Sequence, residues 1–220
     1  MKLKKYISVF CSIALLLTAC AKKEVIKSSS STVGISKITF FPTIETLGER
    51  LIILQEGDAY TDAGASAIVN GEEQEYSTNL TVDVNTPGIY DIVYSIENED
   101  GFSVSDWRTV VVIGTDVSGN DFSGTYARYV AGVPNGQTSS WTKIGNGIYT
   151  VVNPGGATGV TATVVNYEDD LVEVPKQITE AGEFYSVGGE YFPSLTPPEY
   201  HWAIVNASYG TAVRTFKKLP

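Results

Sequence analysis

Short runs of β-branched and aromatic residues, separated by glycine, proline, asparagine and aspartate, fill the chain from residue 37 to its end. Runs of this length and composition suit β-strands, and the residues between them suit tight turns. No stretch shows the hydrophobic period of about 3.6 residues that marks an amphipathic helix, and residues 175–180 would form at most one helical turn. We therefore predict an all-β protein.

The strand pattern breaks at residues 115–121, which we interpret as a linker between two domains, 37–114 and 122–220. The predicted strands of the first domain are 37–41, 50–54, 66–69, 80–84, 88–97 and 103–113. Those of the second are 125–130, 139–144, 148–152, 159–166, 171–175, 183–187, 201–207 and 211–217. Asp100-Gly101 and Asn146-Gly147 each stand between two strands and predict hairpin turns, because glycine accepts a positive φ.

The N-terminal segment has the layout of a secretion signal, with three lysines, an apolar run over residues 6–17 and small residues before Cys20. The apolar run is shorter than the roughly 20 residues that a membrane-spanning helix needs. Leu17-Thr18-Ala19-Cys20 resembles a bacterial lipobox, in which the cysteine receives a lipid and becomes the N-terminus. We expect a signal peptide at 1–19, lipidation of Cys20 and a flexible polar tether over 20–36.

Cleavage of this signal would leave Cys20 as the single cysteine and shift the formal net charge from −10 to −13, because three lysines leave with the signal. The mature chain could then form no internal disulfide, so its stability must come from buried apolar area. Its acidic surface argues against nucleic acid as a partner. We expect no cofactor, and a contact with the membrane only through the N-terminal lipid.

Three motifs in the first domain resemble a bacterial immunoglobulin-like domain. They are Gly57-Asp58-Ala59-Tyr60-Thr61-Asp62-Ala63-Gly64-Ala65, then Pro87-Gly88-Ile89-Tyr90, then Arg108-Thr109-Val110-Val111-Val112. The resemblance covers about residues 38–114 and implies a disulfide-free β-sandwich. In this interpretation Pro87-Gly88 opens a turn, Tyr90 fills the core and Gly64 frees the backbone at a bend.

The second domain resembles the β domain that follows such modules in Bacteroidetes surface lipoproteins, often encoded beside outer-membrane glycan importers. The resemblance rests on Phe122-Ser123-Gly124-Thr125-Tyr126, Gly147-Ile148-Tyr149-Thr150-Val151 and Arg214-Thr215-Phe216-Lys217-Lys218. It implies a second antiparallel β-sandwich or barrel-like domain, and an outer-membrane lipoprotein displayed on the cell surface. The family has no settled activity, so the resemblance supplies context rather than chemistry.

Catalysis has little support in the sequence. His201 is the single histidine, and no Gly-x-Ser-x-Gly motif is present. The carboxylates of the second domain could serve a glycoside hydrolase, but no motif fixes a pair among them. We therefore predict that the protein is not an enzyme.

Calcium is a further alternative, because Asp58, Asp62 and Asp83 offer oxygen ligands near loops. No regular calcium-binding loop is present, and the resemblance to the Ig-like family implies turn and strand roles for Asp58 and Asp62, so no metal is expected.

The aromatic residues of the second domain are the candidate ligand-binding set, because exposed rings can stack on the apolar faces of sugars. Several lie in residues 188–200, which we interpret as a proline-stiffened loop, and Tyr191 and Trp202 are the ones most expected to be exposed. The alternative is core packing, where aromatic residues on strands usually end up. The seven residues are Trp141, Tyr167, Tyr185, Tyr191, Phe192, Tyr200 and Trp202, of which Trp141, Tyr191, Phe192, Tyr200 and Trp202 are the predicted ligand-binding residues.

These observations favour a non-catalytic surface lipoprotein that contributes to glycan binding or uptake. Its partners would be a polysaccharide or oligosaccharide and an outer-membrane uptake complex. The alternative is a structural or protein-interaction lipoprotein with no small ligand, which a continuous apolar patch without a groove would favour.

Overall fold

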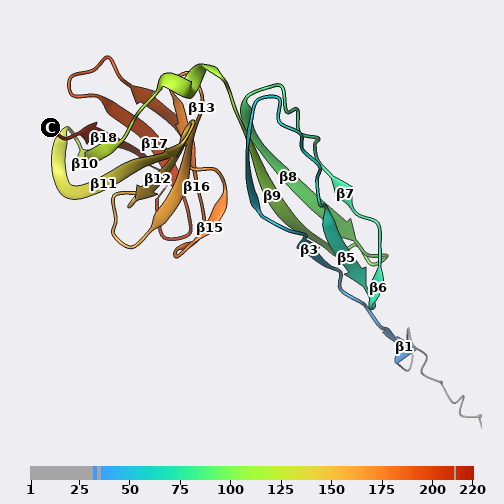
Figure 1. Cartoon of the computed structure of the whole chain (residues 1–220). Coiled ribbons are helices and arrows are strands. Elements are labelled where there is room, and N and C mark those ends of the chain that lie inside the picture. The colour runs from blue at the N-terminus through green and yellow to red at the C-terminus, as the bar shows by residue number, and fades with distance from the viewer. Residues whose placement is uncertain (1–31, 34–35, 211) are drawn as a thin grey trace, which may run out of the picture. The chain divides into compact units, whose positions relative to one another are not determined.

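The computed structural model describes residues 32–33, 36–210 and 212–220 (Figure 1). The predicted signal peptide, Cys20 and most of the predicted tether lie outside these residues. The chain divides into two compact units, 1–40 and 41–220. In the first, β1 (Thr32–Val33) pairs antiparallel with β2 (Ser36–Lys37). Within the described residues, no helix has the length and apolarity needed to cross a membrane.

Residues 43–113 form the predicted β-sandwich, with a three-stranded and a four-stranded sheet. The first sheet has the order β3 (Thr43–Thr46), β5 (Ala65–Val69), β6 (Glu72–Glu73), and the second has the order β4 (Leu51–Gln55), β9 (Ser103–Ile113), β8 (Gly88–Glu97), β7 (Ser77–Thr78). Strands β4 and β9 run parallel, whereas the other pairs are antiparallel. Ala65, Ile92, Tyr94 and Val110 form the buried centre.

Two strands predicted for this sandwich are wrong. Residues 80–84 form no strand, although Leu80 and Val82 pack against the core. The alternation of apolar and polar residues therefore determines which side chains face the core. The backbone of residues 80–84 nevertheless joins no sheet. The strand predicted at 37–41 is also absent beyond Lys37, and β3 begins only after Pro42, which has no N–H to donate to a ladder.

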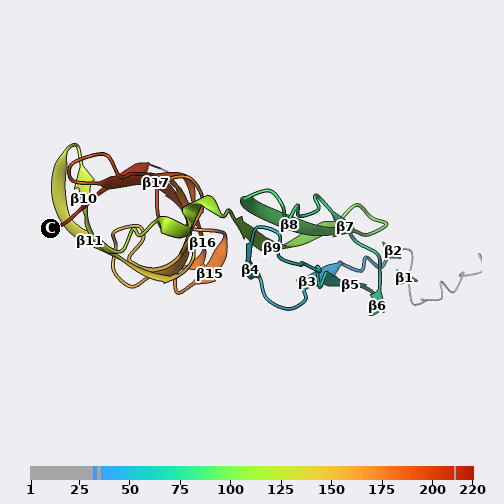
Figure 2. The ribbon, with the colours of Figure 1, turned by 45° about the horizontal axis from the view of Figure 1, so that its top comes forward.

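The second part of the unit is a closed antiparallel barrel, which decides between the two architectures expected from the sequence. Among the described residues, eight strands form a ring in the order β14-β13-β12-β11-β10-β18-β17-β16, and β14 pairs again with β16 (Figure 2). Strand β15 attaches to β16 outside the ring. The strands are β10 (Gly124–Val130), β11 (Val133–Gly145), β12 (Ile148–Val152), β13 (Thr161–Glu168), β14 (Leu171–Glu173), β15 (Gln177–Thr179), β16 (Gly182–Phe192), β17 (Glu199–Val205) and β18 (Val213–Lys218).

Two glycines close the ring at the contact between β14 and β16. The register of β16 shifts between Val187 and Glu190, so Gly188 and Gly189 form a bulge. A Cβ at Gly189 would overlap the carbonyl oxygen of Val172. The carboxylate of Glu173 accepts the N–H of Gly189 at 2.8 Å and the hydroxyl of Ser186, which satisfies polar groups inside this seam.

The barrel interior is filled mainly by aromatic rings. Trp141 and Trp202 stack with centroids 5.5 Å apart, Tyr200 stacks on Phe216 at 4.8 Å, and Phe122 stacks on Tyr191 at 4.0 Å. Large rings bury much apolar area per residue, which suits a domain without disulfides. The buried aromatic residues in the described part of this core are Phe122, Tyr126, Trp141, Tyr149, Phe184, Tyr191, Tyr200, Trp202 and Phe216.

A third buried cluster lies around the predicted linker, which contains the 3₁₀ helix η1 (Asp116–Gly119). Val111, Ile113, Val117 and Val165 pack together there. The N–H of Gly114 donates to the carbonyl of Tyr167 at 2.8 Å. Ile148 and Val165 of this cluster are partners at one end of the β12–β13 pair, so the cluster marks one end of the barrel.

Replacing Gly189 by alanine is expected to lower the free energy of unfolding of the barrel by about 3 kcal/mol, because the added methyl forces β16 away from β14. This corresponds to a fall in melting temperature of roughly 10 °C or more. Gly119→Ala is the matched control, since nothing lies within 4 Å of a Cβ there. Equal melting temperatures of the two variants in calorimetry would refute this account of the seam.

Candidate functional site

The predicted ligand-binding aromatics are mostly core residues, and the expectation that Tyr191 and Trp202 are exposed is wrong. Trp202 and Tyr200 have no exposed surface, and Trp141 and Tyr191 are also buried. The indole N–H of Trp202 donates to the carbonyl of Pro154 at 3.0 Å, so even its polar edge has a partner inside the protein. These four rings cannot present a face to a sugar on the surface.

The prediction of exposed rings depended on residues 188–200, and these residues do not form one loop. Strand β16 continues through Gly188 and Gly189 to Phe192, and β17 begins at Glu199. Gly188 and Gly189, at the start of the predicted loop, form the bulge that closes the barrel. Since side chains alternate along a strand, Tyr191 and Tyr200 point inward, while Phe192 is half-buried beside His201 with ring centroids 4.9 Å apart.

His201 takes part in an ion-pair chain on the barrel wall. Its Nε2 lies 2.9 Å from Glu199 Oε1, and Lys217 Nζ lies 2.7 Å from Glu199 Oε2. Burial acts to raise the pKa of Glu199, but the bonds from Lys217 and His201 outweigh it and lower that pKa. The arrangement joins β17 to β18 through side chains.

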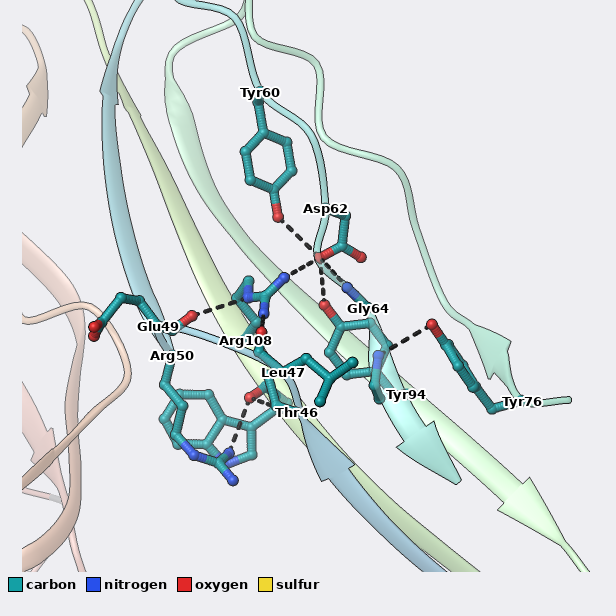
Figure 3. Close-up of polar contacts among 12 residues, drawn as sticks. Thr46, Leu47, Glu49, Arg50, Tyr60, Asp62, Gly64, Tyr76, Tyr94 and Arg108 are labelled. Atoms are coloured by element: carbon teal, nitrogen blue, oxygen red, sulfur yellow. Dashed lines mark hydrogen bonds and ion pairs between the residues drawn. The ribbon is translucent and has the colours of Figure 1, made fainter. Parts of the chain in front are cut away.

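In the Ig-like domain, two of the three motifs, residues 57–65 and residues 108–112, meet at the buried Arg108 (Figure 3). Arg108 of β9 is fully buried and forms an ion pair with Asp62. Its Nε donates to the carbonyl of Glu49 at 3.0 Å, and another guanidinium nitrogen donates to the carbonyl of Leu47. The same oxygen of Asp62 accepts the hydroxyl of Tyr94 at 2.7 Å.

Electrostatics hold Asp62 in its charged form. Burial acts to raise the pKa of its carboxyl, but hydrogen bonds from Tyr94 and Gly64 and the charge of Arg108 outweigh burial and lower that pKa. Burial and the bond to Asp62 raise the pKa of the Tyr94 phenol. This cluster therefore fastens the loop before β5 to the centre of β9.

The remaining aspartates of the calcium alternative serve turns. Asp58 accepts the N–H of Gln55 at 2.9 Å, and Asp83 accepts the N–H of Asn85 at 3.0 Å and the hydroxyl of Thr86 at 2.8 Å. Gly64 adopts φ +72°, as the bend requires. Within the described ranges, no group of three or more His, Cys, Asp or Glu side chains is placed to hold a metal ion.

The barrel carries a groove that the sequence interpretation did not identify. It has a volume of about 520 Å³ and lies among the loops between β12 and β13, between β15 and β16, and between β17 and β18. Because Val152 and Thr161 are partners at the other end of the β12–β13 pair from Ile148 and Val165, the groove lies at the barrel end away from the linker cluster. Its main side chains are Arg128, Glu180, Tyr209 and Arg214.

Two glycines, Gly155 and Gly156, pack closely against one wall of the groove. A Cβ at Gly155 would overlap the ring of Tyr209, and one at Gly156 would lie 2.8 Å from Cδ of Arg128. Asn153 ties this loop through its own N–H to the carbonyl of Val160 at 2.7 Å. Close packing of this loop against Tyr209 and Arg128 restricts the geometry of the groove, and a restricted site reduces the ordering cost of binding.

The groove is also the place where two arginines meet. Arg214 is only 7% exposed, and its guanidinium lies over the ring of Tyr209, 5.1 Å from the centroid. Burial and the nearby charge of Arg128 lower the pKa of Arg214. No sequence motif marks this pair, because residues 128 and 214 come together only when β10 and β18 pair.

Comparison with known proteins supports the immunoglobulin-like interpretation. Residues 44–112 match the family model described as "Bacterial surface protein, Ig-like domain", so this part of the chain is similar to the Ig-like domains of bacterial surface proteins. The chain matches none of the curated proteins.

A solved structure also resembles the chain. It is the crystal structure of the lipoprotein BT2262 from Bacteroides thetaiotaomicron, at 23% sequence identity. The match covers 81% of this chain and 100% of that chain, with a TM-score of 0.36. At this TM-score no property of that lipoprotein transfers to this protein.

Replacing Asp62 by asparagine is expected to lower the free energy of unfolding of the Ig-like domain by about 1–3 kcal/mol at pH 7, because a neutral amide pairs poorly with buried Arg108. Since folding lowers the pKa of Asp62, its contribution is present above the unfolded carboxyl pKa, about 4, and is lost as the pH falls through the folded value. The difference between wild type and variant should therefore shrink below about pH 4.

Urea unfolding at pH 7 and at pH 3 measures this difference. Asp58→Asn is the control, because Asp58 makes one exposed hydrogen bond to a neighbouring N–H. A loss of stability that is the same at both pH values, or equal for the two variants, would contradict the assigned role of Asp62.

Proposed function

We propose that this protein is a non-catalytic surface lipoprotein whose Ig-like domain acts as a spacer and whose barrel binds a glycan at the groove of Arg128, Tyr209 and Arg214. The match of residues 44–112 to a domain of bacterial surface proteins supports placement at the cell surface. The lipobox-like sequence before Cys20 supports lipid anchoring, and the outer membrane of a Bacteroidetes cell is the proposed site.

The observation that carries the binding proposal is the preformed groove at the end of the barrel. Its volume of about 520 Å³ falls in the range of ligand pockets, and it combines an aromatic ring with charged and backbone polar groups. Sugars are recognised by that combination, because a ring packs on their C–H faces while polar groups bond their hydroxyls. The groove thus replaces the buried aromatic set as the proposed glycan site.

A second candidate function is protein interaction without a small ligand, and two exposed apolar pairs favour it. Val130 and Val133, at the tip of the hairpin between β10 and β11, are exposed by 51% and 63%. Phe41 and Phe102 form another exposed apolar pair on the Ig-like domain, with ring centroids 4.8 Å apart. Such surfaces could bind a component of an uptake complex.

Replacing Cys20 by alanine is expected to release the protein from the membrane fraction, because position 20 then offers no thiol to accept the lipid. Mass spectrometry of the native N-terminus should find a lipidated cysteine at position 20. Cys11→Ala is the matched control, since Cys11 lies within the predicted signal peptide. Equal membrane association of the Cys20→Ala variant would refute the anchoring proposal.

Replacing Tyr209 by alanine is expected to weaken retention of the protein on a polysaccharide affinity gel by about tenfold, or 1.4 kcal/mol, because the groove loses its aromatic platform. Tyr129→Ala removes a half-buried tyrosine of β10 that is not part of the groove, and should leave retention unchanged. Melting temperatures of both variants check that the barrel remains folded.

The gel series should include neutral and charged polysaccharides. Retention on none of them would remove the glycan proposal. If the protein then still co-purified with membrane components through a contact that Val133→Ser abolishes, the protein-interaction function would be favoured instead.

A further inference from the structure

The four arginines of this chain fall into two pairs with opposite surroundings. In the Ig-like domain, Arg50 contacts both carboxylate oxygens of Asp106 at 2.6 Å, and Arg108 pairs with Asp62. In the barrel, Arg128 and Arg214 have no carboxylate within ion-pair distance among the described residues. Two like charges therefore converge without compensation in a protein of formal net charge −10.

The polar atoms of this pair are incompletely satisfied. Arg128 donates to the amide oxygen of Gln137 at 2.6 Å, and the bonds that Arg214 makes to described residues are long, 3.3–3.4 Å, and end at the carbonyls of Gly210 and Ala212. Within the part of the chain that the structure describes, the Nε atoms of both arginines are buried without a hydrogen-bond partner. An unpaired buried donor on a charged group costs free energy. A hydrogen-bond acceptor bound at the two arginines would reduce that cost.

Glu180 is the carboxylate that lines the same groove, but it is already engaged elsewhere. It accepts the N–H of Thr161 at 3.2 Å, and backbone bonds to it lower its pKa. It makes no ion pair with either arginine. Its oxygens remain suited to hydroxyl groups, which donate hydrogen bonds to carboxylates.

We propose that Arg128 and Arg214 form a subsite for an anionic substituent, a carboxylate or a sulfate ester, on the sugar bound in the groove. A guanidinium offers paired donors that match the planar carboxylate and two oxygens of a sulfate. The ring of Tyr209 lies against Arg214 and would support the apolar face of the same sugar. This inference rests on the proposed glycan binding and names the class of glycan.

The protein's overall charge makes the inference specific. A net charge of −10 repels polyanions in general, so any affinity for an acidic polysaccharide has to come from a local basic site. The electrostatic contribution to the binding affinity should fall as the salt concentration rises. The fall should be less steep than for exposed lysines, because Arg214 is buried.

The test uses matched pairs of polymers that differ only in charge, and measures affinity by gel retardation. Polygalacturonate and its fully methyl-esterified form test the carboxylate, and dextran sulfate and dextran test the sulfate. At least one charged member should bind about tenfold more tightly than its neutral partner. Arg128→Gln and Arg214→Lys should each remove most of that preference, the second while keeping the positive charge.

Lys217→Gln is the matched control, because it removes one positive charge from β18 outside the groove. It should change affinity by less than about twofold. Equal binding of charged and neutral members, with Tyr209→Ala still weakening both, would overturn the anionic subsite and leave glycan binding standing. Absence of binding by every polymer would overturn both proposals, and equal losses in Lys217→Gln and Arg128→Gln would show non-specific charge attraction and overturn the subsite alone.

Discussion

Closure of the barrel between β14 and β16 is the constraint on which the rest of the C-terminal half depends. The contact is short, because β14 has three residues and a single residue pair, Leu171 and Glu190, joins it to β16. It forms only because Gly188 and Gly189 bulge and let β16 reach the backbone of Val172. In the closed ring, the aromatic side chains on the inner face of the strands fill the core. The stacked pair of Trp141 and Trp202 is a consequence of that closure.

The two halves of the chain handle charge in different ways. In the Ig-like domain, the buried Arg108 bonds to the carboxylate of Asp62 and to two carbonyl oxygens, so its charge is compensated and it joins distant segments. In the barrel, Arg128 and Arg214 gather at a groove without an acidic partner in the described residues. Compensated charge is what a structural role requires, whereas uncompensated charge in a preformed groove is what recognition of an anion requires. The contrast agrees with the proposal that the Ig-like domain is a spacer and the barrel a binding module.

The proposed roles of anchor, spacer and binding module follow one another along the chain. The proposed lipid lies at the N-terminal end, the Ig-like domain follows, and the groove belongs to the barrel at the end of the sequence. Within the barrel, the groove occupies the loops at the opposite end from the linker cluster of Val117 and Val165. This order leaves the groove loops clear of the linker, as a display protein would need. Strands β10 and β18 supply Arg128 and Arg214, and loops between other strands complete the groove.

The sequence by itself determined the fold class, the Ig-like motifs and most strands, because alternation and turn residues are local properties that each segment carries with it. Strands β8 and β9 and the turn at Gly101 follow directly from that pattern. Tertiary structure alone decided which face of β16 and β17 points inward, and so buried Tyr191 and Trp202. It also brought Arg128 and Arg214 together across 86 positions of sequence. Both outcomes depend on pairing between distant strands, and no local pattern encodes which strand will be the neighbour.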